Sequence, residues 1–283
     1  MVKVSVLMPI YRTREDFLRA AIESILHQTY KDFEFIILDD FPEDNREHIV
    51  KSYNDARIKY YKNNSNIGIS PSRNKLIEMA MGEYLAVMDH DDISLPERLA
   101  KQVEYLDNHQ DVGVVGCFIH KIVANKNVKL PVEDEDIKSC LMMKCVINHP
   151  SSMIRKKVLI DNNIRYEEKF TPAEDYKLWC KLMNVTKFHN IPEILFKYRD
   201  WKNNTTSIQS NKMKKSTREI WAENQINHPT LWLKFNSINA VHISTIRLFG
   251  FIPFIKIKQS RERKHILLFD FIPILKIKTS IKV

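Results

Sequence analysis

Glycine is scarce in this chain of 283 residues, with 5 in all, which excludes collagen-like repeats and glycine-rich linkers. There are four cysteines and no CxxC pair, so zinc-ribbon and thioredoxin-type sites have no support. No apolar run reaches the roughly 18 residues that a membrane-spanning helix needs, and no secretory pattern opens the chain. We therefore expect a cytoplasmic protein with four buried free thiols.

Charge is distributed unevenly along the chain. Residues 1–200 hold 29 Lys and Arg against 31 Asp and Glu, whereas the last 83 residues hold 15 against 4. The net charge of +9 therefore comes from the tail, which predicts an anionic partner for it, either a membrane surface or a nucleic acid. Apolar residues make up 44% of the chain, enough for a sizeable core.

Buried strands alternate with amphipathic helices in the first 110 residues. The apolar spacing predicts strands at 2–10, 33–38, 58–61 and 84–88, and helices at 14–27, 45–53, 70–81 and 95–109. This order is typical of a right-handed, doubly wound α/β fold with a mostly parallel sheet. The less regular second half predicts a strand at 112–123, helices at 133–143 and 173–182, and a turn at Pro192 followed by a strand.

Acidic clusters follow two of these strands. Asp39-Asp40 and Asp89-His90-Asp91-Asp92 would lie at the carboxyl ends of the sheet, where such folds bind ligands. Three carboxylates within four residues favour a divalent cation such as Mg²⁺ or Mn²⁺ on a diphosphate. The alternative is a solvated acidic turn that caps the next helix through Asp92 or Ser94.

Asp39 and Asp40 could accept hydrogen bonds from a base or a ribose, or could simply form a turn. The first strand is not followed by GxGxxG, so the usual dinucleotide motif is absent.

Four further residues outside the acidic clusters are candidates for the site. Glu174-Asp175 opens a helix. Either the pair is there because the helix dipole favours acidic residues at this end, or it includes a general base. His149, within Asn148-His149-Pro150-Ser151, is either structural or part of an acceptor loop. Arg73 could reach a diphosphate from the start of its helix, although a solvated helical face is the alternative.

Six segments in this order resemble the family 2 glycosyltransferases of the GT-A fold, over about residues 2–205. The matching segments are VSVLMPIY (4–11), SILHQTY (24–30), FEFIILDD (33–40), NIGISPSRNKLIEMAMGEYLAVMDHDD (66–92), LPERL (95–99) and AEDYKLW (173–179). The resemblance implies a Rossmann-like, mostly parallel sheet flanked by helices, and an inverting transfer of a sugar from a nucleotide-diphosphate donor to a hydroxyl.

The resemblance also implies a role for each matching position. It places Pro9, Tyr11, Asp39, Asp40, Arg73 and Asp89 at the nucleotide, usually a UDP-sugar. Asp89, Asp91 and Asp92 match the DxD-type motif that holds Mn²⁺ or Mg²⁺, and Asp175 matches the catalytic base. Glu174 and His149 are our candidates for contact with the acceptor.

Two positions depart from the family pattern. Phe41-Pro42-Glu43-Asp44 replaces the Gly-Ser-Thr-Asp turn after the acidic pair. Trp201 stands where Tyr-Arg-x-His relatives carry a histidine near the metal, and Asp200 is the alternative ligand there. A sugar-nucleotide-binding protein that has lost catalysis therefore remains a second hypothesis.

We expect a catalytic domain at 1–205, with a nucleotide half at about 1–110 and an acceptor half at about 111–205, and a basic amphipathic region at 206–283. LFGFIPFIKIK at 248–258 recurs as LFDFIPILKIK at 268–278. Bulky apolar groups mixed with Lys favour attachment to the inner face of the cytoplasmic membrane, with packing on the catalytic domain as the alternative. That location suits a saccharide or lipid-linked acceptor in surface polysaccharide or lipooligosaccharide synthesis. A nucleic-acid-binding protein is the rival hypothesis, but no such motif is present.

Overall fold

The computed structural model describes residues 2–43, 46–201, 210–238, 242–248, 252–260, 263–268 and 277–279. The chain divides into two units, Met1–Ile226 and Asn227–Val283, and each is considered by itself. The predicted domain boundary, between residues 205 and 206, lies before α9 (Ser210–Asn227). Asn224 on this helix donates a hydrogen bond of 3.1 Å to the backbone oxygen of Leu141, which belongs to the first unit. Most of α9 thus belongs with the larger unit.

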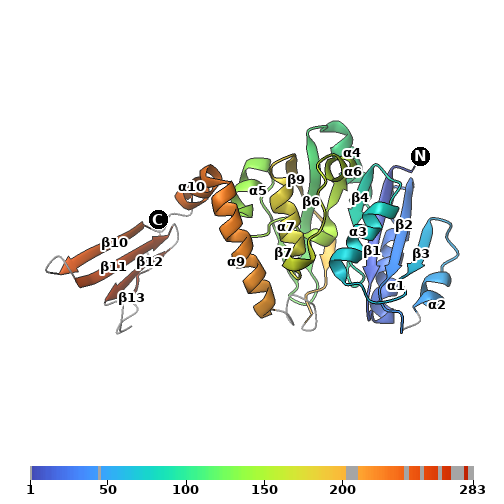
Figure 1. Cartoon of the computed structure of the whole chain (residues 1–283), viewed down its shortest axis with the longest axis horizontal. Coiled ribbons are helices and arrows are strands. Elements are labelled where there is room, and N and C mark those ends of the chain that lie inside the picture. Colours follow the sequence, from blue (N-terminus) through green and yellow to red (C-terminus); the bar gives the residue numbers. More distant parts are fainter. Residues whose placement is uncertain are drawn as a thin grey trace. The chain divides into compact units, whose positions relative to one another are not determined.

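The first half is a parallel sheet, as its apolar strands predict. β1 (Val4–Ile10) pairs with β2 (Phe33–Asp39) on one side and with β4 (Tyr84–Val87) on the other, and β3 (Ile58–Lys62) extends the sheet beyond β2. Figure 1 shows these strands side by side. Their connections contain α1 (Glu15–Leu26), α2 (Glu47–Lys51) and α3 (Ile69–Met79). The chain reverses its direction of winding at β1, so β1 and β4 form a switch point, where such sheets bind ligands.

The second half adds antiparallel strands to the same sheet. β8 (Met153–Arg155) pairs antiparallel with both β4 and β6 (Val112–Lys121), and β9 (Lys187–Tyr198) runs parallel to β6. The short strands β5 (Ile93–Ser94) and β7 (Lys126–Val128) pair with β9 and β6. The prediction of a turn at Pro192 is wrong, because the residue lies inside β9. The register passes from Ile191 to Ile194, so Pro192 occupies a bulge, where a missing N–H costs no ladder bond.

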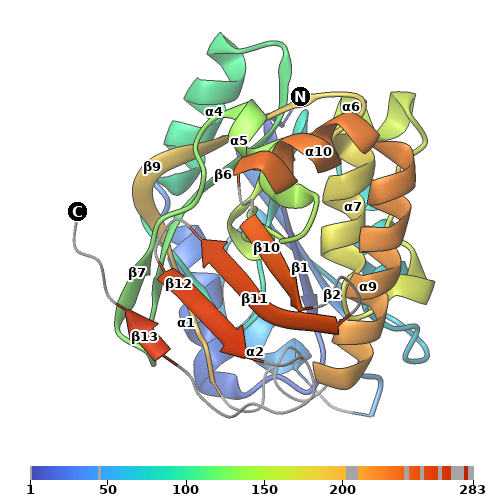
Figure 2. The same cartoon turned by 90° about the vertical axis from the view of Figure 1, so that its left-hand side faces the viewer.

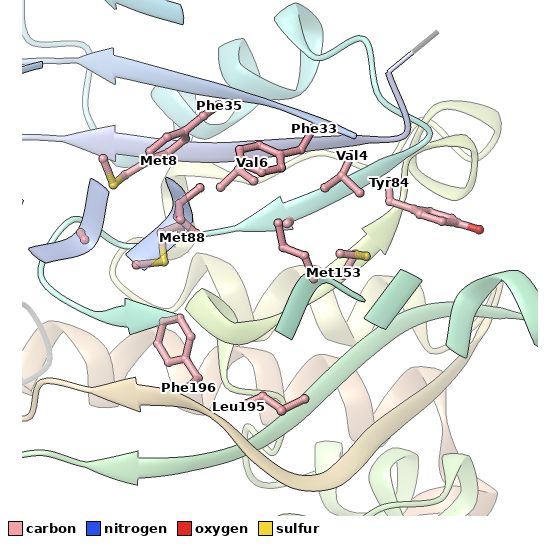
Figure 3. Close-up of a cluster of buried hydrophobic side chains, with 14 of the residues drawn as sticks. Val4, Val6, Met8, Phe33, Phe35, Tyr84, Met88, Met153, Leu195 and Phe196 are labelled. Carbon is pink, nitrogen blue, oxygen red and sulfur yellow. The ribbon is translucent and has the colours of Figure 1, made fainter. Parts of the chain in front are cut away.

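The core lies between the sheet and its helices. Figure 3 shows Val6 and Met8 of β1 beside Phe35 of β2, with Met88, Met153 and Phe196 near them. The spacing that predicts α1 also places its buried residues on one face, at Leu18, Ala21, Ile22 and Ile25. Each large side chain buried here contributes about 1.5–3 kcal/mol, which accounts for most of the driving force that holds the layers together.

Further helices and turns complete the larger unit. They are α4 (Arg98–Asn108), α5 (Asp134–Leu141), α6 (Lys156–Asp161) and α7 (Glu174–Leu182), with 3-10 turns at His149–Ser151 and Glu168–Phe170. The four thiols are free, as expected, but only Cys117 and Cys180 are buried, and Cys140 and Cys145 are half-buried.

The smaller unit contains α10 (Pro229–Ile238) and an antiparallel sheet of β10 (His242–Leu248), β11 (Ile252–Ser260), β12 (Arg263–Leu268) and β13 (Ile277–Thr279), labelled in Figure 2. Within the described residues, no helix is long and apolar enough to cross a membrane.

Candidate active site

The acidic loop, Asp89-His90-Asp91-Asp92, leaves the carboxyl end of β4 at the switch point of the sheet. Asp89 and Asp91 are half-buried, whereas Asp92 is buried. The loop is therefore neither a solvated turn nor a fully enclosed cluster.

Asp92 points into the protein. Its Oδ1 accepts a hydrogen bond of 2.7 Å from the backbone N–H of Arg199, while its Oδ2 is buried and finds no partner among the described residues. Burial, followed by the charges of Asp91 and Asp89, raises the pKa of Asp92 well above its ordinary value. An anion in this position is costly unless positive charge is brought to it.

Asp91 is held from the segment that follows β9. The indole N–H of Trp201 donates to Asp91 Oδ2 at 2.9 Å, and Arg199 Nε donates to the backbone oxygen of Asp91 at 2.7 Å. Asp200, the alternative ligand suggested by the sequence, points elsewhere, because its Oδ1 accepts the backbone N–H of Val123 at 2.8 Å. Asp200 therefore does not replace the histidine that the family pattern predicts.

Arg73 on α3 connects the acidic loop to the start of α7. Its guanidinium donates to Glu174 Oε1 at 2.6 Å and to Asp89 Oδ1 at 3.4 Å. Burial alone would lower the pKa of Arg73, but the charges of Glu174 and Asp89 outweigh it and raise the pKa above the ordinary value. Arg73 thus brings together two acidic segments that lie far apart in the sequence.

Glu174 and Asp175 are neighbours with different surroundings. The Glu174 side chain is only 6% exposed and is paired with Arg73, and its contact with the acceptor stays a prediction. Asp175 is half-buried and accepts the backbone N–H of Tyr176 at 2.7 Å. Burial and then the charge of Glu174 raise the pKa of Asp175 to about 6. A carboxylate with this pKa is ionised at neutral pH and is still basic enough to accept a proton efficiently.

His149 is a buried residue at the start of the 3-10 turn His149–Ser151. The residue is 3% exposed, and its Nε2 is 2.7 Å from the hydroxyl of Tyr166. Burial and the nearby Arg73 lower the pKa of His149 well below its ordinary value, so the ring is neutral. His149 thus contacts Tyr166, whose ring lies 5.5 Å from the Arg73 guanidinium, and contact of His149 with the acceptor stays a prediction.

The acidic pair after β2 is engaged by the protein itself. Asp39 accepts hydrogen bonds from the backbone N–H of Phe41 at 3.0 Å and from the hydroxyl of Tyr60 at 2.8 Å. Asp40 accepts three, from the Asn63 side chain and from the backbone N–H groups of residues 67 and 68, at 2.8 to 2.9 Å. Asp40 thereby fixes the loop that leads into α3, and contact of either residue with a base or ribose stays a prediction.

The carboxyl end of β1 presents an aromatic group. Pro9 is buried within the strand, two residues beyond the last pairing of β1 with β4, whereas Tyr11 is 40% exposed. The Tyr11 ring meets the Phe41 ring edge-on at 5.2 Å, and the guanidinium of Arg12 lies 5.3 and 5.0 Å from the two ring centres. Phe41, where the sequence departs from the family pattern, thus contributes to an exposed aromatic and cationic group beside the acidic pair.

Comparisons with known proteins identify the family of this chain. A sequence model described as glycosyl transferase family 2 matches residues 5–166, more than half of the chain. This chain belongs to glycosyltransferase family 2. An uncharacterized glycosyltransferase of Methanocaldococcus jannaschii is 39% identical to it over 205 residues, which cover 69% of this chain and 70% of that protein. WfgD of Escherichia coli, named a UDP-Glc:alpha-D-GlcNAc-diphosphoundecaprenol beta-1,3-glucosyltransferase, is 29% identical over 220 residues, covering 76% of this chain and 83% of WfgD.

Solved structures show the same fold at low sequence identity. Residues 1–349 of TarS from S. aureus, in complex with UDP-GlcNAc, match with a TM-score of 0.67 at 20% identity, covering 79% of this chain and 66% of that one, just under two thirds of its length. The mannosyltransferase PcManGT from Pyrobaculum calidifontis, in complex with GDP-Man and Mn²⁺, matches with a TM-score of 0.63 at 16% identity, covering 84% and 70%. The larger unit of this glycosyltransferase therefore has the predicted GT-A fold.

The side chains of the acidic loop suit a divalent cation that takes its other ligand atoms from a bound phosphate and from water. Within the part of the chain that the structure describes, no group of three or more His, Cys, Asp or Glu side chains is arranged to hold a metal. Asp91 and Asp89 each keep one carboxylate oxygen outside the hydrogen bonds described above, and carboxylate oxygens suit Mg²⁺ and Mn²⁺. Phosphate oxygens and water would have to supply the remaining ligands, as is usual for Mg²⁺.

Sequence patterns did not identify Arg98 as a residue that supports this site. Arg98, in the LPERL segment, is fully buried and donates to the backbone oxygens of Val87 and Ser152 at 2.8 and 3.0 Å. Burial lowers the pKa of Arg98 to about 10, and no carboxylate is among its described hydrogen-bond partners. Arg98 fixes the end of β4 directly before the acidic loop, and it places a positive charge behind the loop.

Proposed function

We propose that this glycosyltransferase is an inverting, metal-dependent enzyme that transfers a sugar from a UDP-linked donor to a hydroxyl of a lipid-linked saccharide. The observation that carries the proposal is the Arg73 bridge. It joins Asp89 of the acidic loop to Glu174, and so brings Asp175, the next residue, beside that loop. Burial, and after it the charges of neighbouring carboxylates, raises the pKa values of Asp89, Asp92 and Asp175, which favours the arrival of a cation.

Donor and acceptor class are inferred from relatives. TarS was solved with UDP-GlcNAc, and the name of WfgD gives a UDP-linked sugar and a diphosphoundecaprenol-linked acceptor. The exposed Tyr11 ring offers a stacking surface for a nucleoside, beside the carboxylate pair at the end of β2. A UDP-hexose or UDP-N-acetylhexosamine is the donor that fits these relatives.

The proposed reaction is a single nucleophilic displacement at the anomeric carbon of the donor sugar. Asp89 and Asp91 would hold a Mn²⁺ or Mg²⁺ ion, which would supply positive charge to offset the charge that develops on the leaving diphosphate. Asp175 accepts the proton of the acceptor hydroxyl while the hydroxyl oxygen attacks the anomeric carbon from the face opposite the diphosphate, which inverts that carbon. Arg73 holds Glu174 and Asp89 in place, so the base and the donor site keep a fixed relative position.

A thermal-shift panel of UDP-, GDP- and dTDP-sugars with Mn²⁺ tests the donor class. We expect the UDP-sugars to stabilise the protein, since a ligand at 100 times its Kd adds about 2.7 kcal/mol. Donor hydrolysis with Mn²⁺ then tests catalysis. Asp175→Asn should lower the rate at least 100-fold, while Asp161→Asn, at an exposed carboxylate, should not change it. Donor binding without hydrolysis in the wild type would instead support a binding protein without catalysis.

We propose further that the smaller unit attaches the enzyme to the inner face of the cytoplasmic membrane. The register of the strands aligns Ile257, Ile266 and Ile277 in one row and Lys258, His265 and Lys278 in the next. Successive rows lie on opposite faces of a sheet, so the row with Lys258 and Lys278 gives one face of these strands a basic character, which suits an anionic lipid surface, where each Lys contributes about 1 kcal/mol.

Co-sedimentation with vesicles of phosphatidylglycerol tests this attachment. Replacing Lys256, Lys258 and Lys278 with glutamine in the full chain should weaken binding about 100-fold, whereas glutamine at three exposed lysines of the larger unit, Lys51, Lys157 and Lys169, should change it little. Equal losses in the two triple variants would count against the proposed surface.

A further inference from the structure

We propose that Trp201 is a positioning residue that orients the Asp91 carboxylate for cation binding, so that Asp91 binds the cation through one oxygen, Oδ1. This inference rests on the proposed function, since it assumes that the acidic loop takes a divalent cation. An indole N–H is a donor only and cannot itself bind a cation, so Trp201 acts through Asp91.

Residues 199–201 form a strap across the acidic loop. Arg199 and Trp201 donate three hydrogen bonds of 2.7 to 2.9 Å to it, which reach Asp92 Oδ1, the backbone oxygen of Asp91 and Asp91 Oδ2. Asp200, between them, turns the other way to Val123. Side chains that alternate in direction are typical of an extended segment, here the continuation of β9. The alternation directs Arg199 and Trp201 toward the acidic loop.

The strap is anchored on α1. The ring of Trp201 meets the ring of Phe17 edge-on, with centres 5.6 Å apart and planes at 82°, and the guanidinium of Arg199 lies 4.1 Å from the centre of the same ring. An edge-on aromatic pair contributes about 0.5–1.5 kcal/mol beyond the area it buries. Phe17 therefore restrains both strap residues through its ring, and its side chain forms no hydrogen bond to the loop.

The hydrogen bond divides the roles of the two Asp91 oxygens. Oδ2 accepts the indole N–H, while Oδ1 has no hydrogen bond in the described contacts. A donor behind a ligand carboxylate fixes its orientation before the cation arrives, and removal of such a partner typically weakens metal binding about 10- to 100-fold. The same donor would hinder bidentate binding, in which both oxygens face the ion.

Mn²⁺ binding measured by the electron paramagnetic resonance signal of the free ion, with and without UDP, tests the proposal. Trp201→Phe keeps the ring against Phe17 but removes the N–H, and we expect its Kd for Mn²⁺ to rise about 10- to 100-fold. Trp221→Phe, which removes an indole N–H from α9, is the matched control and should leave the Kd unchanged.

The outcomes distinguish failure of the positioning role of Trp201 from failure of the proposed function. An unchanged or lower Kd in a folded Trp201→Phe variant overturns the positioning role, whereas a higher Kd with an unchanged thermal midpoint in the absence of metal supports it. If Trp201→Phe does not fold, Phe17→Leu decides, because loss of the anchor should raise the Kd at least threefold, and no change overturns the proposal. A wild-type protein that binds no Mn²⁺ with UDP refutes the proposed function itself. Quenching of tryptophan fluorescence by Mn²⁺, lost in Trp201→Phe but kept in Trp221→Phe, would locate the ion beside Trp201.

Discussion

Replacing Glu174 with glutamine should move the acid limb of the pH–activity profile, because Glu174 is the neighbouring charge that raises the pKa of Asp175. Burial is the largest cause of the raised pKa, the Glu174 charge is the next, and Arg73 acts in the opposite direction. Glutamine keeps an oxygen that can accept the hydrogen bond of 2.6 Å from Arg73, but it carries no charge. The substitution therefore removes the charge while it keeps the bridge.

The size of the effect follows from the pKa of about 6. A base that must be ionised is about one-tenth active one pH unit below its pKa, so the wild type at pH 5 should keep roughly a tenth of its plateau rate. Loss of a nearby like charge lowers the pKa by about one unit, or about 1.4 kcal/mol. Glu174→Gln should then keep about half of its own plateau rate at pH 5, which is roughly five times the wild-type fraction.

The assay is donor hydrolysis with Mn²⁺, with kcat/KM measured from pH 4.5 to 8, since this ratio reports ionisations of the free enzyme. Comparing the fraction of the plateau within each protein cancels any loss in absolute rate. Circular dichroism over the same pH range checks that both proteins stay folded. A limb that stays in place, or moves to higher pH, would refute the assignment of Asp175 as the titrating base.

Three further substitutions test the site and the sheet. Asp40→Ala leaves three donors of the α3 loop unpaired and should lower the free energy of unfolding by about 3 kcal/mol in urea titration; a loss below 1 kcal/mol would mean that the loop does not depend on Asp40. Asp175 is protonated more readily when folded, so its contribution to stability falls as pH rises through the window from 3.8 to about 6. Asp175→Asn should therefore raise the thermal midpoint at pH 7.5 by several degrees and not at pH 4, and a lower midpoint at pH 7.5 would contradict this sign. Gly82→Ala places a methyl group 2.5 Å from the backbone nitrogen of Ser5 and should cost about 2–3 kcal/mol by the same titration, while an unchanged midpoint would show that β1 can shift.

The fold was predictable where local pattern determines it. β1, β2 and β4 are apolar runs, α1 has helical spacing, and each begins or ends within two residues of its predicted position. β8 was not predicted, because its three residues owe their extended shape to pairing with β4 and β6, which lie elsewhere in the sequence. α2 is shorter than predicted, at Glu47–Lys51, and residues 44–45 lie outside the described part of the chain.

The acidic residues of the site were predictable from the sequence, but the side chains that donate hydrogen bonds to them were not. A run such as Asp89-His90-Asp91-Asp92 is conspicuous in sequence because repulsion between carboxylates demands an explanation. Arg73 and Glu174 are 101 positions apart, and their pairing depends on how α3 and α7 are placed. The same reason explains why the burial of His149 against Tyr166 was not predicted, since its polar neighbours suggested a polar loop on the acceptor side.

Trp201 shows how a departure from a family pattern can mislead when it is interpreted by residue type alone. The absence of histidine at this position suggested weakened metal binding and kept a protein without catalysis among the hypotheses. The structure places an N–H donor there that reaches the same acidic loop, 110 positions away in sequence. A histidine could bind a cation directly, whereas the indole can only fix the carboxylate that binds it, so the two residues would serve one loop by different physical means. The replacement is therefore not evidence against catalysis.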